Sequence, residues 1–484
     1  MGTEKKTEGK KVSRRKFIAG AGAAVVVVVG AAGAYYLTRP SAPPPTVATT
    51  TTPPTTAPPV ATTASSTSAA FDLATAAKPY SGSTVNISCL NYPTMDSLKA
   101  VAPTFTQITG VNVSFQELGM DDLFAKQTLD LAQATGSFDV LNHNFSWLPV
   151  YASKLQDLSV YFNDPTLMNQ DAYDINDYLP IALKFYSNFG GKMLGLPITA
   201  DWQILVYRTD VFSQNGISAP PDTWDDFASI AAKVTSPPSL YGTEFTGLRG
   251  TDPVWEWLYY LRSYGVPVFD ESFNPVFNGS AGINATQNYV NLYKQPFTLP
   301  SSTGLGYAEY NSTMQTGLVA MAPLMWISAL PPLLSPSSSK VAGKLGFALP
   351  PSGGSHVISM GGWGLSIPAN AQNKEAAWLF ISWATSPQIE RQRLPLGGAP
   401  ARISILQDPS LQQQYAWFPV VQKMGSLTID SLASDGGKLT PQWFPVIEPI
   451  LEEDISAALS GTMSVKDALA DAASRIKSGL AGSS

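Results

Sequence analysis

The sequence is poor in cysteine, histidine and charge. It has one cysteine, Cys89, among 484 residues, which excludes an internal disulfide and any metal site built from several cysteines. Its two histidines, His143 and His356, are too far apart in sequence to form a local metal-binding motif. Charged residues make up 14% of the chain, against roughly 25% in typical globular proteins, and the net charge is −6. No broad basic surface is therefore available to a nucleic-acid partner.

Motifs of the common enzyme classes are also missing. The chain has no G-x-S-x-G, H-E-x-x-H, complete G-x-G-x-x-G or Walker A sequence. A glycoside hydrolase would need two facing carboxylates, and nothing in the sequence points to such a pair. We therefore predict that the protein is not an enzyme and has no catalytic residue, metal or cofactor.

The N-terminal region has the features of an export signal or membrane anchor. Residues 1–16 are strongly basic, and residues 17–38 contain the apolar run FIAGAGAAVVVVVGAAGAYYL. At 1.5 Å per residue this run spans roughly 30 Å, about one bilayer core. Positive charge before it predicts that the N-terminus stays in the cytoplasm and that the remainder lies outside. The sequence SRRKF resembles a twin-arginine export signal, although paired basic residues occur in other signals too. Both cleavage near Ala32–Ala34 and retention as an anchor fit this segment.

A segment rich in proline, threonine and serine follows at residues 39–79. Its first part, to residue 68, can extend on the order of 90 Å as a polyproline-like spacer, and such stalks are often O-glycosylated. Asn-X-Ser/Thr sequons follow at Asn86, Asn112, Asn144, Asn278, Asn284 and Asn311. We predict a surface glycoprotein at the extracellular face of the cell membrane, either anchored there or released after cleavage.

From about residue 80, apolar residues follow strand and helix periods in turn. Strands are predicted at 84–90, 111–118 and 138–144, separated by helices at 95–110 and 121–136. This alternation predicts parallel βαβ units. Cys89, inside the first strand, is expected to be a small buried hydrophobe.

The pattern restarts later in the chain, which favours two α/β lobes over one. A strand is predicted at 201–208, and helices at 222–234, 373–387 and 462–476. Thr223, followed three residues later by an acidic residue, predicts an N-cap for the first of these helices. Trp224, Trp378 and Trp383 lie on helical apolar stripes, so we expect them in the core.

Five stretches, in order over residues 80 to 480, resemble the extracellular solute-binding proteins of ABC importers, in the carbohydrate group that includes maltose-binding protein. They are FDVLNHNFSWLPVYASKLQDLS, GKMLGLPITADWQILVYRTDVFSQNGISAPPDTWDDF, MQTGLVAMAPLMW, MGGWGLSIPANAQNKEAAWLFISWATSP, and PLGGAPAR with the C-terminal LSGTMSVKDALADAASRI. Two departures are Arg208, where the family often has Asn, and the absence of a lipobox cysteine, which leaves the mode of anchoring open.

The resemblance implies a two-lobed periplasmic-binding-protein-like α/β fold with a ligand cleft. Lobe one would comprise residues 80–198 and 350–398, and lobe two residues 205–345 and 403–480. Three crossing segments, near Leu196–Gln203, Ala348–Pro351 and Gly397–Ala401, would act as hinge loops, because Gly and Pro cluster there and small residues absorb backbone rotation.

The chemistry of the expected cleft favours a carbohydrate. The chain has 11 tryptophans, whose flat rings can stack on sugar C–H faces while Asn, Asp and Gln bind the hydroxyls. Candidate ligand-binding residues stand at strand ends, beside crossings or in Gly/Pro loops, with Trp326 and Trp443 added through the resemblance. They are Asn91, Tyr92, Asn142, His143, Trp147, Asp201, Trp202, Trp326, Gly362, Trp363 and Trp443. A structural role for His143 is equally compatible with the sequence.

We therefore predict a substrate-binding protein, tethered to the cell surface, that captures a mono- or oligosaccharide for the membrane subunits of an ABC importer. One alternative is a receptor of the same fold for a peptide, a polyamine or a metal chelate, although the sequence shows neither the carboxylate cluster nor the His/Tyr cluster that such ligands favour. A secreted carbohydrate-active enzyme or a structural surface-layer role is a further alternative.

Overall fold

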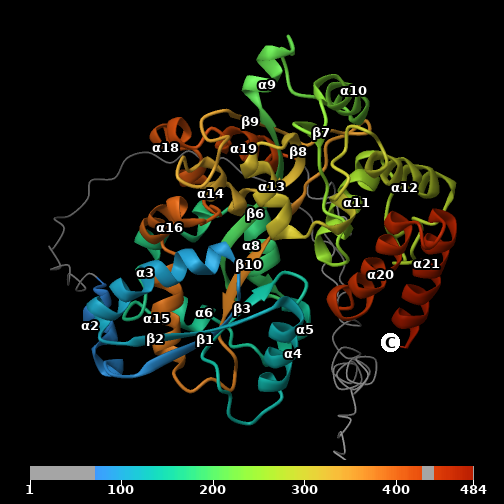
Figure 1. Ribbon diagram of the computed structural model, residues 1–484. Helices are drawn as coiled ribbons and strands as arrows, with labels where there is room; N and C mark the ends of the chain where they lie inside the picture. Colours follow the sequence, from blue (N-terminus) through green and yellow to red (C-terminus); the bar gives the residue numbers. More distant parts are fainter. Residues whose placement is uncertain (1–70, 428–440, 483–484) are drawn as a thin grey trace, which may run out of the picture.

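The computed structural model describes residues 71–427 and 441–482 of the chain (Figure 1). The predicted basic N-terminus, the apolar segment 17–38 and most of the stalk lie outside these residues. Within the two described ranges, no helix combines the length and the apolar character that a membrane span requires.

The first strands of the sheet follow the predicted βαβ pattern. They are β1 (Thr84–Leu90), β2 (Asn112–Leu118) and β3 (Val140–Asn144), connected by α3 (Pro93–Thr109) and α4 (Met120–Leu131). β1 pairs in parallel with both β2 and β3, which confirms the prediction of parallel units. Cys89 is fully buried, as expected for a small apolar side chain in this position.

The 13-residue strand β6 (Leu196–Arg208) joins two parts of one eight-stranded sheet. Its first half pairs antiparallel with β10 (Met360–Ser366), which on its other edge pairs antiparallel with β3. Its second half pairs antiparallel with β8 (Val319–Trp326) and β9 (Leu345–Ala348). β7 (Tyr241–Thr243) completes this end of the sheet by pairing in parallel with β8.

The prediction of a hinge loop at one of the three crossings is therefore wrong in its local structure. Residues 196–203 were predicted as a loop crossing, but they form the first part of the continuous strand β6. Residues 196–206 are all buried, so the strand has covered faces on both sides and lacks the apolar–polar alternation that marks a half-exposed strand.

Several longer helices lie in the same half of the molecule as β7 and β8, some packed on these strands and the others packed on helices (Figure 1). They are α10 (Trp224–Val234), α11 (Thr251–Ser263), α12 (Ser280–Tyr293), α13 (Tyr307–Thr316), α20 (Glu448–Ser460) and α21 (Val465–Ala481). The Thr223 hydroxyl accepts the backbone N–H of Asp226 at 3.1 Å, which confirms the predicted N-cap of α10. In Figure 1 the red helices α20 and α21 lie beside α11 and α12, with which they are in contact.

Helix α15 (Lys374–Ala384) packs on the opposite part of the molecule, beside α2 and α3 (Figure 1). Trp378 and Trp383 on this helix are buried, as is Trp224 on α10, which confirms that these three tryptophans belong to the core.

Shorter elements connect these parts. They are α2 (Leu73–Ala77), α5 (Leu148–Tyr151), α6 (Ser159–Phe162), α7 (Gln170–Tyr173), α8 (Pro180–Tyr186), β4 (Asn188–Phe189), β5 (Lys192–Met193), α9 (Thr209–Gln214), α14 (Leu330–Leu334), α16 (Pro387–Arg393), α17 (Ile403–Leu406), α18 (Pro409–Gln414) and α19 (Phe418–Gly425). The mixed α/β character is confirmed. The predicted bounds of the two lobes stay a prediction.

Candidate functional site

Asp201 is a buried carboxylate in the middle of β6, the strand shared by both parts of the sheet. Its side chain accepts three hydrogen bonds: from the Tyr92 hydroxyl, from the Ser328 backbone N–H at 3.1 Å and from the Ser328 hydroxyl at 2.5 Å. Tyr92 directly precedes α3, and Ser328 follows β8 in a short 3₁₀ turn (Ile327–Ala329). Residues far apart in the chain therefore meet at one carboxylate.

Tyr307, at the start of α13, extends this polar group. Its hydroxyl lies 3.3 Å from the Ser328 hydroxyl, and its ring centroid lies 5.8 Å from that of Tyr92. Burial raises the pKa of Asp201 to about 6, and the hydrogen bonds from Ser328 and Tyr92 oppose that rise. Asp201 is therefore ionised near neutral pH, and as a carboxylate it can accept hydrogen bonds from ligand hydroxyls. We call Tyr92, Asp201, Tyr307 and Ser328 the Asp201 cluster.

A second polar contact lies at the end of β8. The Trp326 indole N–H donates to the Asp252 carboxylate at 3.2 Å. Burial raises the pKa of Asp252, and the hydrogen bond from Trp326 opposes this. A Cβ atom on Gly361 would lie 3.1 Å from the Trp326 ring, so the glycine lets strand β10 approach the indole closely. Trp255, one turn after Asp252 on α11, lies 6.5 Å from Trp326 between ring centroids.

Further aromatic rings connect the end of β3 with α11 and with a π-helical turn (Trp443–Ile447). Trp147 lies 5.4 Å from Trp363 and 5.1 Å from Phe444 between ring centroids. Phe145 lies 5.8 Å from Trp255, and Trp255 lies 6.4 Å from Trp443. Trp147 and Trp363, predicted from separate stretches of sequence, thus belong to one group of aromatic contacts, and Trp326 and Trp443 belong to a second group around Trp255.

The side chains of Asn142 and His143 contact the sheet rather than these aromatic groups. The Asn142 side chain accepts the Leu90 backbone N–H and donates to the Gly364 carbonyl, both at 3.3 Å. His143 is fully buried, and a Cβ atom on Gly364 would lie 2.6 Å from its Nε2. Burial lowers the pKa of His143 to about 4, so the imidazole is neutral. The structure therefore favours the structural role for His143.

Three further predicted residues are separated from the Asp201 side chain. Trp202 is fully buried, and side chains alternate along a strand, so its ring faces away from that of Asp201. A Cβ atom on Gly425 would lie 3.8 Å from the Trp202 ring. Asn91 is exposed beyond β1. Gly362 has φ +134°, and a Cβ there would lie 2.5 Å from the Thr199 carbonyl oxygen, so this glycine is required by the backbone itself.

Sequence reasoning missed Ser328, Tyr307, Asp252, Trp255 and Phe444. Ser328 stands two positions after Trp326, and Asp252 and Trp255 belong to the run GTDPVW, where Gly and Pro precede an aromatic residue. A Gly or Pro before an aromatic residue marks the start of a helix or turn. The contacts of these side chains form only when strands more than a hundred residues apart in sequence pair.

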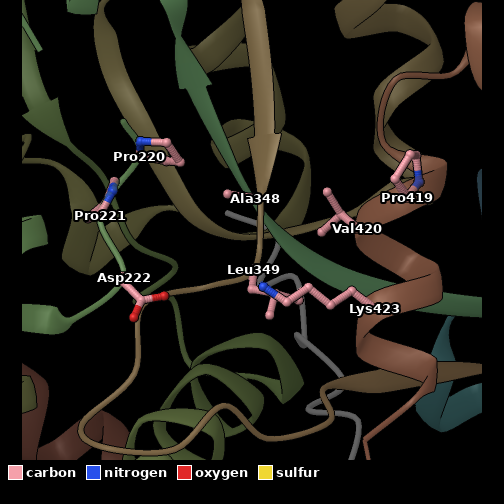
Figure 2. Close-up of a pocket in the computed structure, with 8 residues that line it drawn as sticks. All are labelled: Pro220, Pro221, Asp222, Ala348, Leu349, Pro419, Val420 and Lys423. Atoms are coloured by element: carbon pink, nitrogen blue, oxygen red, sulfur yellow. The ribbon is translucent and has the colours of Figure 1, made fainter. Parts of the chain in front are cut away.

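Within residues 71–427 and 441–482, no group of three or more His, Cys, Asp or Glu side chains is arranged to hold a metal ion. A separate cavity of about 290 Å³ lies beside β9 and α19. Figure 2 shows Pro220, Pro221 and Asp222 on one side, Ala348 and Leu349 between, and Pro419, Val420 and Lys423 on the side of α19. Its lining is mostly apolar and includes no member of the Asp201 cluster, so it offers few partners for a hydroxyl-rich ligand.

The fold, with a polar and aromatic site at the strand shared by both parts of its sheet, is that of a two-lobed solute receptor. A solute-binding protein of an ABC transporter from Agrobacterium radiobacter, solved in complex with ribitol, superposes with a TM-score of 0.74 and 26% sequence identity. The match covers 83% of this chain and 100% of that chain. The predicted two-lobed fold class is therefore confirmed.

Residues 92–390 match the sequence profile of the bacterial extracellular solute-binding proteins, and the chain belongs to this family. It is a solute-binding protein of an ABC importer. A relative from Sinorhizobium fredii, described as a probable amino-acid ABC transporter periplasmic-binding protein, is 28% identical and covers 84% of this chain and 91% of its own length. The erythritol/L-threitol-binding protein of Mycolicibacterium smegmatis is 26% identical over 64% of this chain and 68% of its own. Family and neighbours are binding proteins rather than enzymes.

Proposed function

We propose that this protein captures an uncharged polyhydroxylated ligand, a sugar or a sugar alcohol, and delivers it to the membrane subunits of an ABC importer. The Asp201 cluster is the observation that carries this proposal. A buried carboxylate and three hydroxyl side chains lie together, beside indole rings of Trp326 and Trp255. Carboxylates and hydroxyls bind ligand hydroxyls, and indoles stack on C–H faces.

The charge of the site supports a neutral ligand. The acidic groups, Asp201 and Asp252, accept hydrogen bonds from Tyr92, Ser328 and Trp326, and no lysine or arginine belongs to these contacts within the described chain. An amino acid would bring a carboxylate, which is best bound by an arginine or by backbone N–H groups. The polyols named for the Mycolicibacterium smegmatis and Agrobacterium radiobacter relatives fit the same reasoning, whereas the amino-acid description of the Sinorhizobium relative does not.

A thermal-shift panel tests the ligand class. It should contain pentitols and hexitols, mono- and oligosaccharides, amino acids and polyamines, each at the same concentration. We expect at least one polyol or sugar to raise the Tm, because a ligand that binds only the folded state stabilises it. Calorimetric titration then gives the affinity. A Tm increase with amino acids or polyamines alone would overturn the proposal.

We also propose that the protein acts at the extracellular face of the membrane, held by residues 17–38 through the stalk 39–79. The family is extracellular, and the basic, apolar and Pro/Thr/Ser-rich segments stand in the order that a tether needs. Cell fractionation with intact-mass measurement tests this. A membrane-bound chain that retains residues 17–38 supports the anchor, and a free chain that begins after Ala34 contradicts it.

Glycosylation at the sequons belongs to the same proposal, with one exception. The Asn144 side chain is buried and accepts the Ser146 backbone N–H and hydroxyl at 3.1 and 3.0 Å. A glycan at this residue would displace those contacts, so we expect Asn144 to be unmodified. Glycopeptide mass spectrometry of the native protein would show which of the sequons carry sugar.

A further inference from the structure

A second group of buried acids lies apart from the Asp201 cluster. Glu244 directly follows β7, and Glu256 is in the middle of α11. Both residues have 0% of their surface exposed. The Tyr289 and Tyr293 hydroxyls from α12 each donate to the same Glu256 oxygen at 3.3 Å, and the Thr246 backbone N–H donates to the other at 3.2 Å.

Glu244 differs from Glu256 because nothing in the described chain donates to it. Both of its carboxylate oxygens are buried without a hydrogen-bond partner. The hydroxyls of Thr246 and Tyr310 are also buried, and the Thr246 hydroxyl lies beside the Glu256 carboxyl group. Tyr310, on α13, is close enough to both glutamates for their charges to raise its pKa. The two unpaired oxygens of Glu244 would be costly to bury if nothing else bound them.

The charge of Glu256 also acts on Glu244. Burial raises the pKa of Glu256 to about 8, and burial together with the charge of Glu256 raises the pKa of Glu244 well above its usual value. Two neighbouring buried carboxylates cannot both be ionised at low energy unless a cation neutralises them. A divalent ion would neutralise the pair completely.

We propose that Glu244 and Glu256 bind a calcium ion, with the Thr246 and Tyr310 hydroxyls as further oxygen ligands. Calcium takes six to eight oxygen ligands in flexible geometry, whereas magnesium requires a near-octahedral site and usually retains several waters. The candidate ligands are all oxygen atoms in the protein interior, which disfavours zinc and other metals that prefer nitrogen or sulfur.

The site would also support the proposed ligand site through α11. Asp252 precedes Glu256 by one helical turn, accepts the Trp326 indole N–H, and its negative charge is among the causes that raise the pKa of Glu256. A bound cation would lower this repulsion and fix the helix that carries Asp252 and Trp255. The ion is therefore structural, and it would not touch the solute.

Calcium titration of the chelator-treated, full-length protein tests the proposal in the absence of any sugar. Calorimetry is expected to show about one ion per chain, and calcium to raise the Tm by about 5 °C or more. Magnesium at the same concentration should have a smaller effect. Elemental analysis of the untreated protein gives the metal content independently of any variant.

Glu244→Gln should weaken calcium binding at least about tenfold, because it removes one of two charges while preserving side-chain size. Glu309→Gln is the matched control, since Glu309 is exposed and precedes Tyr310 on α13, and it should bind calcium like the parent. The proposal is overturned if the parent binds no calcium, or if Glu244→Gln binds it equally well. Should Glu244→Gln fail to fold, the parent titration and the metal content still decide. None of these results depends on whether a sugar binds at Asp201.

Discussion

Asp201 and the pair Glu244 and Glu256 are equally buried but differ in their hydrogen-bond donors. Asp201 receives three hydrogen bonds, and its pKa is raised only to about 6. Glu256 receives three longer ones and has a pKa of about 8, while Glu244 receives none and its pKa is higher than usual by a wide margin. Burial disfavours the charged form in each case, and the donors decide how far. The Asp201 cluster can therefore stabilise a negative charge without a bound cation, whereas the surroundings of Glu244 and Glu256 cannot.

The largest effect that separates the two regions is expected for Asp201→Ala. It leaves the Tyr92 and Ser328 hydroxyls and the Ser328 backbone N–H without their shared acceptor, which should lower the free energy of unfolding by about 3 to 5 kcal/mol. Sugar or polyol binding should be lost as well. Urea unfolding and calorimetry measure the two effects. Asp210→Ala is the control: this carboxylate pairs with Arg208 near the surface and should change stability by less than about 1 kcal/mol.

The second prediction concerns pH in calcium-free buffer. A carboxyl whose folded pKa is raised binds more protons in the folded state, so its contribution to stability falls as pH rises from the unfolded to the folded pKa. For Asp201 this fall should be complete near pH 6, whereas for Glu256 it should continue to about pH 8. Between pH 6 and 8 we expect Glu256 alone to account for a loss of about 2 kcal/mol, with further losses from Glu244 and Glu448, whose pKa values burial also raises.

Glu256→Gln should reduce that loss, and saturating calcium should do the same for the parent. The remaining slope has the same sign, because burial also raises the pKa of Glu448 to about 8. Unfolding curves at pH 6, 7 and 8 are sufficient for this comparison. An equal loss in the parent and in Glu256→Gln would show that Glu256 does not titrate in this range.

The third prediction concerns the indole rings of Trp326 and Trp255, which lie between the Asp201 cluster and the pair Glu244 and Glu256. Trp326→Ala and Trp255→Ala should each weaken sugar or polyol binding by about 1 to 3 kcal/mol, roughly 5- to 150-fold, since each removes stacking area. Trp257→Phe on the same helix is the control. It loses the 2.8 Å indole bond to Thr286 and part of a fully buried ring, so it should lower stability by about 1 to 3 kcal/mol and leave affinity unchanged. Affinities equal to that of the parent in both alanine variants would place the ligand elsewhere.

The smallest effect is expected for Tyr92→Phe. It removes one of three donors to Asp201 and keeps the ring, so stability should fall by about 1 to 2 kcal/mol. The pKa of Asp201 should rise, which makes binding decline at a higher pH than in the parent. Titration of affinity between pH 5 and 8 checks the shift. An unchanged profile would mean that Ser328 alone sets the charge of Asp201.

Much of the fold follows from local patterns. The strands and helices from Thr84 to Asn144 agree with their predicted ranges within a few residues, because each has a clear period and a glycine or proline near its boundary. Strand β6 was only half predicted, since its first residues are buried on both faces and carry no alternation. The antiparallel pairing of β10 with β3 and β6 had no local signal at all.

The site was predictable only in part. Tyr92, Asp201 and Trp326 do lie together in the region of the shared strand, but their role in ligand binding stays a prediction. Trp202 and Asp201 were both predicted because they stand beside a crossing, yet adjacent residues of a strand face opposite sides. Ser328 and Tyr307 were missed because a hydroxyl residue becomes part of a site through the tertiary structure, and serine or tyrosine alone gives no distinctive pattern.

The position of β10 has a consequence for how the chain is made. It lies in the sheet between β3 and β6, but Met360 follows the end of β6 by about 150 residues. At ribosomal rates of about 5 to 20 residues per second, that delay is roughly 8 to 30 s. During this time the growing chain lacks the strand that covers one edge of β3 and the first half of β6, and open strand edges invite pairing with other chains. The central part of the sheet is therefore completed late in synthesis, and shielding of these two edges by a chaperone would matter most before residue 366 emerges.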